Sequence, residues 1–93
     1  MEIVKNSVVK SIAGHDKGSF YMVLDVGGGY ATIADGRRRP VERPKRKSER
    51  HLAPTQTVLA LDGPTNKQLW EALRGFNLPH TDSRQGGNVL VKG

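Results

Sequence analysis

The chain has 93 residues and no cysteine, and its 15 lysine and arginine residues against 9 acidic ones give a net charge of +6. This length supports one small domain with a modest core and leaves little room for a deep catalytic cleft. The absence of cysteine excludes disulfides, thiolate chemistry and cysteine-based zinc sites. No apolar run approaches the roughly 20 residues that span a bilayer, and the first residues lack the apolar stretch of a signal peptide. We therefore expect a cytoplasmic protein with no membrane partner.

Residues 1–61 carry strand signals separated by short turns. β-branched and aromatic residues predict strands at 7–13, 20–26, 30–34 and 57–61, with residues 51–55 leading into the last one. The first strand ends at the polar turn Gly14–Gly18. Gly27–Gly29 is interpreted as a hairpin turn, and Asp35-Gly36 as a two-residue hairpin turn from which a further strand returns. This pattern indicates a mainly β fold, a small barrel of about five short antiparallel strands.

The excess positive charge lies in one segment, residues 37–50, with the sequence RRRPVERPKRKSER. Eight basic and two acidic side chains give this segment a charge of +6, so the rest of the chain is formally neutral. Pro40 and Pro44 cannot donate hydrogen bonds to a neighbouring strand, so we predict a largely exposed loop. The basic residues are Arg37, Arg38, Arg39, Arg43, Lys45, Arg46, Lys47 and Arg50.

Dense lysine and arginine attract the phosphate backbone of nucleic acids, and the arginine guanidinium can pair with phosphate or stack on bases. A solvating tail, a localisation tract or an acidic protein partner would also account for a basic run. Strand signals on both sides of residues 37–50 anchor the segment to the fold, which favours contact with RNA.

The turn Gly14–Gly18 is a second candidate for RNA contact. Its backbone could approach a phosphate or a base, with Lys17 as a point charge and His15 as a hydrogen-bonding or stacking group. The alternative is that its glycines only satisfy a backbone conformation. Gly27–Gly29 precedes no helix and fits neither GxxxxGK[ST] nor GxGxxG, so it is not interpreted as a phosphate-binding loop.

A helix is predicted after the breaker Asp62-Gly63-Pro64, within a helical extension spanning residues 62–78. Thr65 and Gln68 fit a capping box, Leu69, Trp70, Leu73 and Phe76 form an apolar stripe, and Gly75 is a plausible end. A helix of this length needs a surface to dock on. Trp70 could stack on a base or bind a protein partner, but docking of the helix is favoured. Residues 79–93 are predicted to form a flexible tail.

Catalysis and metal binding are not expected. His15, His51 and His80 lack the spacing of metal ligands, and His51 is interpreted as a structural residue packed beside Leu52. No serine, histidine and aspartate set can be argued at this size. We therefore predict a protein that is not an enzyme and has neither a cofactor nor a small-molecule substrate.

The stretch 8–18, VVKSIAGHDKG, followed by residues 20–26, resembles a KOW motif, in which a turn ending in glycine joins two strands. The resemblance continues through IADGRRR at 33–39 and HLAPT at 51–55. These segments are similar to the fourteenth large-subunit ribosomal protein family of archaea and eukaryotes and to its short bacterial relatives. The resemblance covers about residues 3–60. Asn6-Ser7 stands before the first strand, where KOW motifs often have glycine.

The resemblance implies an SH3-like barrel over residues 1–61 and RNA as the partner, with ribosomal RNA or the ribosome as the expected target in translation. The predicted RNA-binding residues are the eight basic residues of 37–50 together with Lys10, His15 and Lys17. We expect a monomer when the protein is not bound. The alternative is a protein-interaction module of a transcription or translation complex. The chain has few aromatic residues for such a surface, and the core needs several of them.

Overall fold

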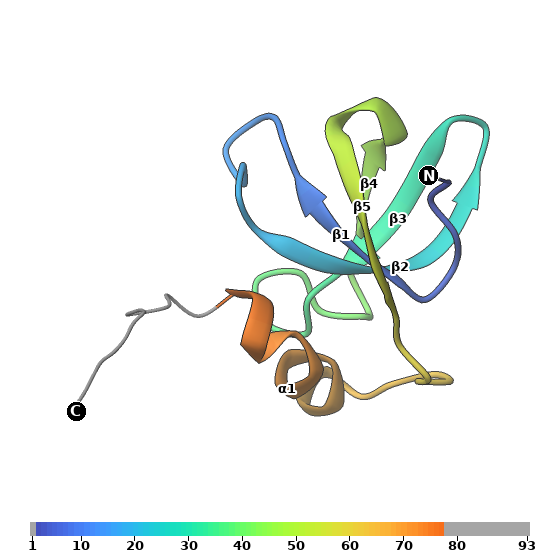
Figure 1. Cartoon of the computed structure of the whole chain (residues 1–93). Helices are drawn as coiled ribbons and strands as arrows, with labels where there is room; N and C mark the ends of the chain where they lie inside the picture. The colour runs from blue at the N-terminus through green and yellow to red at the C-terminus, as the bar shows by residue number, and fades with distance from the viewer. Residues whose placement is uncertain (1, 78–93) are drawn as a thin grey trace.

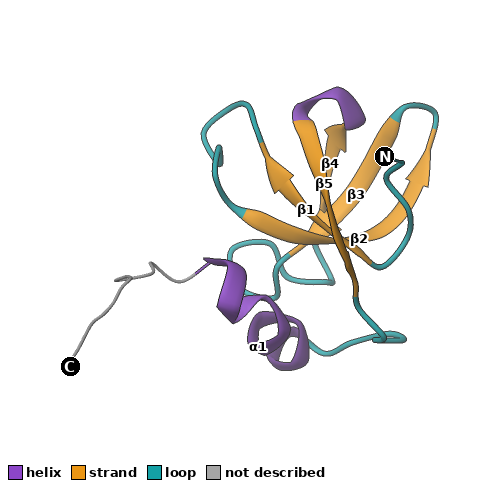
Figure 2. Cartoon of the chain, viewed as in Figure 1, coloured by secondary structure: helices purple, strands orange, loops and turns teal. Residues whose placement is uncertain are grey.

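The computed structural model describes residues 2–77 and contains one five-stranded antiparallel sheet and one α-helix (Figures 1 and 2). The strands run in the order β4-β3-β2-β1-β5 across the sheet. The elements are β1 Ser7–Ser11, β2 Phe20–Gly27, β3 Tyr30–Ala34, β4 Lys45–Ser48, the 3-10 helix η1 Glu49–His51, β5 Leu52–Val58 and α1 Asn66–Asn77. The mainly β prediction is confirmed, and the arrangement is compatible with a small SH3-like barrel. The tail predicted at 79–93 lies outside the described residues.

The sheet is bent, and both of its faces contribute to the core. On one face Val9, Tyr21 and Ile33 form a cluster with other buried side chains of β2, β3 and β5. On the other face Val8 and Met22 pack with Leu69 and Leu73 of α1. Neighbouring residues of a strand point to opposite faces, so β1 and β2 each supply both clusters. Figure 2 shows α1 lying against one end of the sheet.

α1 is therefore part of the folded unit. Thr65 and Gln68 form the predicted capping box, with reciprocal backbone-to-side-chain hydrogen bonds of 3.0 and 3.1 Å. The helix continues past Gly75, where we predicted its end, to Asn77. The Asn77 side chain hydrogen-bonds to both backbone groups of Phe20, at 2.8 and 3.0 Å. These bonds join the end of the helix to the start of β2. Among residues 2–77, no helix has the length and apolar character needed to cross a membrane.

Asn6 adopts a backbone conformation that favours glycine. Its φ angle is 72°, and it is the one described residue other than glycine with a positive φ. The strain is compensated locally, because the Asn6 backbone bonds to Val23 at 2.7 Å and to Leu59 at 2.8 Å, and its side chain donates to the Leu61 carbonyl at 3.3 Å. Asparagine tolerates this region better than most residues do. Asn6 thus takes, directly before β1, a left-handed backbone conformation for which glycine is the usual residue.

The prediction of a two-residue hairpin at Asp35-Gly36 is wrong. Residues 35–44 form a longer connection, and β4 pairs with β3 only from Lys45 opposite Ile33. The buried carboxylate of Asp35 accepts hydrogen bonds from the backbone N–H groups of Arg37 and Arg39, both at 2.9 Å. These bonds fold the chain into a compact loop instead of returning it directly as a strand.

Two further strand predictions need correction. The second half of the basic segment is not a loop, because residues 45–48 form β4. The last strand spans Leu52–Val58 instead of 57–61, although it contains Pro54. β5 lies at the edge of the sheet, bonded only to β1 in the strand order, and an edge position tolerates the missing N–H of proline.

Gly36 fastens the 35–44 connection to the helix. Its φ angle is +84°, and a Cβ at this position would collide with the backbone carbonyl of Asn66 and lie 3.0 Å from the backbone nitrogen of Trp70. Next to this contact, the Asn66 side chain accepts a hydrogen bond from Val41 N–H at 2.8 Å and donates one to Glu42 at 2.9 Å. Close backbone packing therefore orders the loop that carries the first arginines.

Substitution of Gly36 should destabilise the fold more than that of another glycine with positive φ. We expect Gly36→Ala to lower the free energy of unfolding by about 2–4 kcal/mol, since backbone strain and steric overlap add. Gly63→Ala is the matched control, because Gly63 has a φ of +57° and nothing within 4 Å of its Cβ position. Urea denaturation followed by Trp70 fluorescence measures both. Equal losses for the two variants would contradict the close packing at Gly36.

Candidate nucleic-acid interface

Asp16 lies at the centre of a hydrogen-bonded cluster that joins the Gly14–Gly18 turn to β4. Its Oδ1 accepts from Lys47 Nζ at 2.6 Å and from Ser11 Oγ at 2.7 Å. Its Oδ2 accepts from the Tyr21 hydroxyl at 2.9 Å and from Lys45 Nζ at 3.3 Å. One carboxylate therefore holds side chains from β1, β2 and β4.

Lys47 is a structural residue, which corrects its prediction as an RNA contact. Its side chain is 7% exposed, and the ammonium group donates to Asp16, to Ser11 Oγ at 2.8 Å and to the Ala13 carbonyl at 2.7 Å. These three acceptors use all three ammonium hydrogens, as a buried lysine requires. Lys47 thus has neither the exposure nor the donor capacity left to bind phosphate.

The cluster shifts two ionisation equilibria. Burial alone would raise the pKa of Asp16, but the hydrogen bonds from Lys47, Ser11, Tyr21 and Lys45 together outweigh it and hold the pKa well below its ordinary value. Burial, and then the hydrogen bond to Asp16, raise the pKa of Tyr21 to about 12. Asp16 is therefore ionised and Tyr21 protonated throughout the physiological range.

A hollow of about 260 Å³ opens beside this cluster, and four of the predicted RNA-binding residues line it. The Arg38 guanidinium is held at its edge by a 2.9 Å hydrogen bond to Ser19 Oγ and a 3.8 Å contact with the Asp35 carboxylate. The Arg38 side chain stays 63% exposed. The lining residues are His15, Asp16, Tyr21, Arg38, Arg39 and Lys45. Lys47 and Lys45 already neutralise Asp16. Arg38 and Arg39 therefore give the hollow a net positive charge.

Arg37 does not line the hollow but is supported by the helix. Its guanidinium sits 4.8 Å from the centre of the Trp70 ring, in cation–π contact. Leu69 and Leu73 bury the helix against the sheet, while Trp70 is half-buried next to the 35–44 connection. Trp70 belongs to neither buried apolar cluster, and its ring instead supports one arginine, while Leu69, Leu73 and Phe76 dock the helix.

The opposite face of β4 carries a second group of predicted residues. Arg46 lies between Lys45 and Lys47 in sequence, so its side chain points to the other face of the strand. Its guanidinium stacks 4.0 Å from the centre of the Tyr30 ring. Arg50 and His51 line a separate hollow next to Tyr30. His51 is exposed, so the prediction that it packs beside Leu52 is wrong.

The other predicted RNA-binding residues are exposed but lie outside both hollows. Lys10, on β1, is 5.8 Å from the centre of the Phe20 ring. Lys17 lies in the Gly14–Gly18 turn, and Arg43 lies in a turn closed by its backbone bond to Pro40 at 2.9 Å. These three side chains can add charge at the margins of an interface but do not form a site together.

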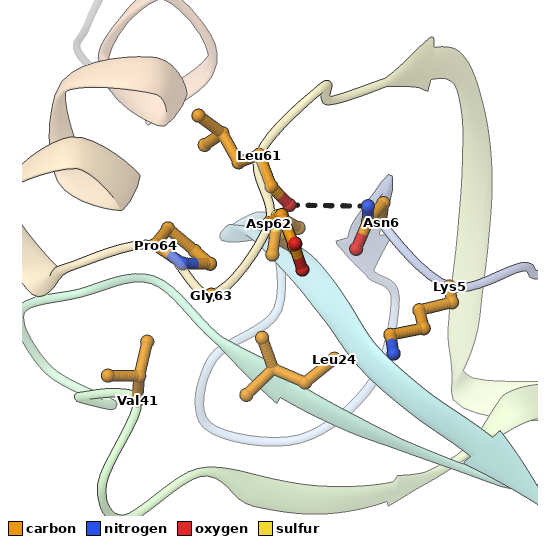
Figure 3. Close-up of a pocket in the computed structure, with 9 residues that line it drawn as sticks. Lys5, Asn6, Leu24, Val41, Leu61, Asp62, Gly63 and Pro64 are labelled. Carbon is orange, nitrogen blue, oxygen red and sulfur yellow. Dashed lines mark hydrogen bonds between the residues drawn. The ribbon is translucent and has the colours of Figure 1, made fainter.

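An apolar groove of about 480 Å³ lies where the chain between β5 and α1 passes the sheet (Figure 3). Its apolar lining residues are Met22, Leu24, Val41, Leu61 and Pro64, and its charged ones are Lys5 and Asp62. It contains none of the predicted RNA-binding residues. Among residues 2–77, no three histidine, aspartate or glutamate side chains are grouped in a way that could hold a metal ion.

Removing the charge of Asp16 should strongly destabilise the protein. Asp16→Asn leaves the Lys47 ammonium buried without a counterion, which costs about 3–5 kcal/mol in the free energy of unfolding. The double variant Asp16→Asn/Lys47→Met should regain part of that loss. Urea denaturation measures both, with the exposed Asp25→Asn as control. A loss no larger than that of Asp25→Asn would contradict the role assigned to the cluster.

The stabilisation due to Asp16 should also depend on pH. The folded-state pKa is lowered from 3.8, so this stabilisation is complete above the unfolded-state pKa and is lost as pH falls through the folded-state value. We expect the stability difference between the unmodified protein and Asp16→Asn to be constant from pH 7 to about 5 and to shrink below about 4. Urea titrations at several pH values measure it. A difference that grows on acidification would show that the pKa is raised instead.

Comparisons with known proteins assign no family to this surface. The chain matches no model of a known protein family, and a search of curated protein sequences finds no similar protein. The resemblance to the KOW family therefore stands on the three sequence segments that carry it. The five-stranded antiparallel sheet is compatible with a small SH3-like barrel.

Proposed function

We propose that this protein binds RNA through the basic surface around the hollow lined by Arg38, Arg39 and Lys45. The observation that supports the proposal is convergence. Residues from the β1–β2 turn, the 35–44 connection and β4 meet at one positively charged hollow, although up to 30 positions separate them in the sequence. Phosphate groups are the ligands that such a set of guanidinium and ammonium groups fits best.

The geometry favours a preformed binding surface. Arg37 rests on Trp70, Arg38 is bonded to Ser19, and the backbone of Arg39 is held by Asp35. Side chains and backbone that are already ordered lose less conformational entropy when a ligand binds. We assign the phosphate contacts to Arg37, Arg38, Arg39 and Lys45, with His15 beside them, and extend the proposal to ribosomal RNA or the ribosome, in the cytoplasm, on the strength of the KOW resemblance.

A protein-interaction module of a transcription or translation complex is the second candidate. The observation in its favour is the apolar groove of Figure 3, which combines leucine, valine and proline side chains. That groove lacks an aromatic lining residue, whereas aromatic residues are typical anchors of protein interfaces. The convergence of cations makes RNA the stronger proposal.

Neutralising the three consecutive arginines should weaken RNA binding and its salt dependence. We expect Arg37→Gln/Arg38→Gln/Arg39→Gln to bind ribosomal RNA fragments at least about tenfold more weakly at low salt. The log–log salt slope should flatten by about 0.7–0.9 for each phosphate that the variant no longer neutralises. Fluorescence anisotropy across a salt series measures both quantities, with an unrelated RNA to test selectivity.

The matched control is Lys5→Gln/Lys67→Gln/Arg74→Gln, which removes the same charge from exposed positions away from the hollow. A purely global charge effect would weaken both triple variants equally, and that result would contradict the proposed surface. No binding of any RNA by the unmodified protein at low salt would overturn the function itself.

A further inference from the structure

The hollow beside Tyr30 differs in chemistry from the phosphate-binding hollow. It lies between the β2–β3 turn and η1, has a volume of about 650 Å³, and is lined by Gly28, Gly29, Tyr30, Ser48, Glu49, Arg50 and His51. Its residues include an aromatic ring, two cations or potential cations and one carboxylate. That composition suits a ligand with a flat apolar body and polar edges better than it suits a phosphate alone.

The turn that forms one wall of this hollow leaves space for a ligand. Gly28 and Gly29 have φ angles of +61° and +82°, and a Cβ at either position would meet nothing within 4 Å. The turn is fixed to the opposite wall by a 3.0 Å hydrogen bond from Glu49 N–H to the Gly29 carbonyl. The walls are thus tied together while the space between them stays open.

Tyr30 lines the hollow, and the Arg46 guanidinium stacks on its ring. Tyr30 pairs with Ser48 and Thr32 pairs with Arg46 across the two strands, which makes Tyr30 and Arg46 diagonal neighbours on one face. The tyrosine is 41% exposed, and the guanidinium lies 4.0 Å from its ring centre. Aromatic rings and arginine planes are the surfaces on which unpaired RNA bases stack.

The presence of Glu49 indicates that this hollow binds a base instead of a second phosphate. A carboxylate repels phosphate but accepts hydrogen bonds from the N–H groups of a base edge. The ion pairs found among residues 2–77 involve only Asp16 and Asp35 as acids, so Glu49 is not neutralised in this way. Guanine presents two adjacent N–H donors on its Watson–Crick edge, which match the two oxygens of a carboxylate.

We infer that this hollow binds one unpaired nucleobase, with guanine as the best fit, stacked on the Tyr30 ring that Arg46 supports and bonded to Glu49. Arg50 and His51 face the phosphates that flank the base. The inference rests on the proposed RNA binding and deepens it, because phosphate contacts carry no sequence information whereas a base site does. The two faces of β4 then have separate tasks, backbone attachment on one and base selection on the other.

The test compares fluorescein-labelled single-stranded oligouridine with the same strand carrying one central guanosine, by fluorescence anisotropy on the full chain. The unmodified protein should prefer the guanosine strand by roughly tenfold. Tyr30→Ala should weaken binding of that strand at least about fivefold, while Tyr30→Phe, which keeps the ring, should stay within about twofold. Glu49→Gln should reduce the preference without weakening oligouridine binding.

A second measurement separates this inference from the proposed function. Titration with guanosine 5′-monophosphate should shift the backbone amide NMR signals of Gly28, Gly29 and Arg50, and uridine 5′-monophosphate should shift them less. If Tyr30→Ala binds RNA as well as the unmodified protein does, and neither prefers the guanosine strand, the base site is overturned. The proposed phosphate surface is not affected by that result. Loss of RNA binding in the arginine triple variant, with the nucleotide shifts intact, would support both sites. Absence of both RNA binding and nucleotide shifts would overturn both.

Discussion

The buried contact between Lys47 and Asp16 is the interaction on which the arrangement of the basic segment depends. The sequence lysine, arginine, lysine, serine has a low intrinsic propensity to form a strand. Lys47 stabilises the strand, because its ammonium group binds Asp16 of the Gly14–Gly18 turn, 31 residues away in the sequence. Once this side chain points inward, strand periodicity directs Arg46 outward. One buried ion pair thus fixes the register of β4 and divides its cations between two faces.

A second set of contacts fixes the arginines that precede β4. The Asp35 carboxylate accepts hydrogen bonds from the backbone N–H groups of Arg37 and Arg39. Gly36 packs against the start of α1, and the Asn66 side chain accepts a hydrogen bond from Val41 N–H. The helix is consequently more than an extension of the barrel. It buries the second face of the sheet through Leu69 and Leu73, and the same element keeps the first arginines in an ordered loop.

The local features of this fold were predictable from the sequence, and its long-range polar contacts were not. Strand periodicity, the glycine hairpin and the capping box at Thr65 are encoded within a few residues, and each is present. The Asp35-Gly36 prediction failed because a hairpin signal does not reveal that the carboxylate will bind the next backbone groups. The burial of Lys47 was missed because a dense run of charge hides the alternation of a strand.

The division of β4 changes what the charge of the chain means for binding. A count of eight basic residues in 37–50 suggests eight cations for one partner, but Lys47 is buried and Lys45 shares the Asp16 carboxylate. Of the six arginines in 37–50, Arg38 and Arg39 line the hollow at Asp16, and Arg37 precedes them in contact with Trp70. Arg46 and Arg50 lie on the side of Tyr30, and Arg43 lies outside both hollows. A nucleic acid that touches only one side neutralises only part of the +6 charge. A ligand that uses all of these arginines has to pass across β4, and a folded RNA with an unpaired nucleotide next to a helix has that shape.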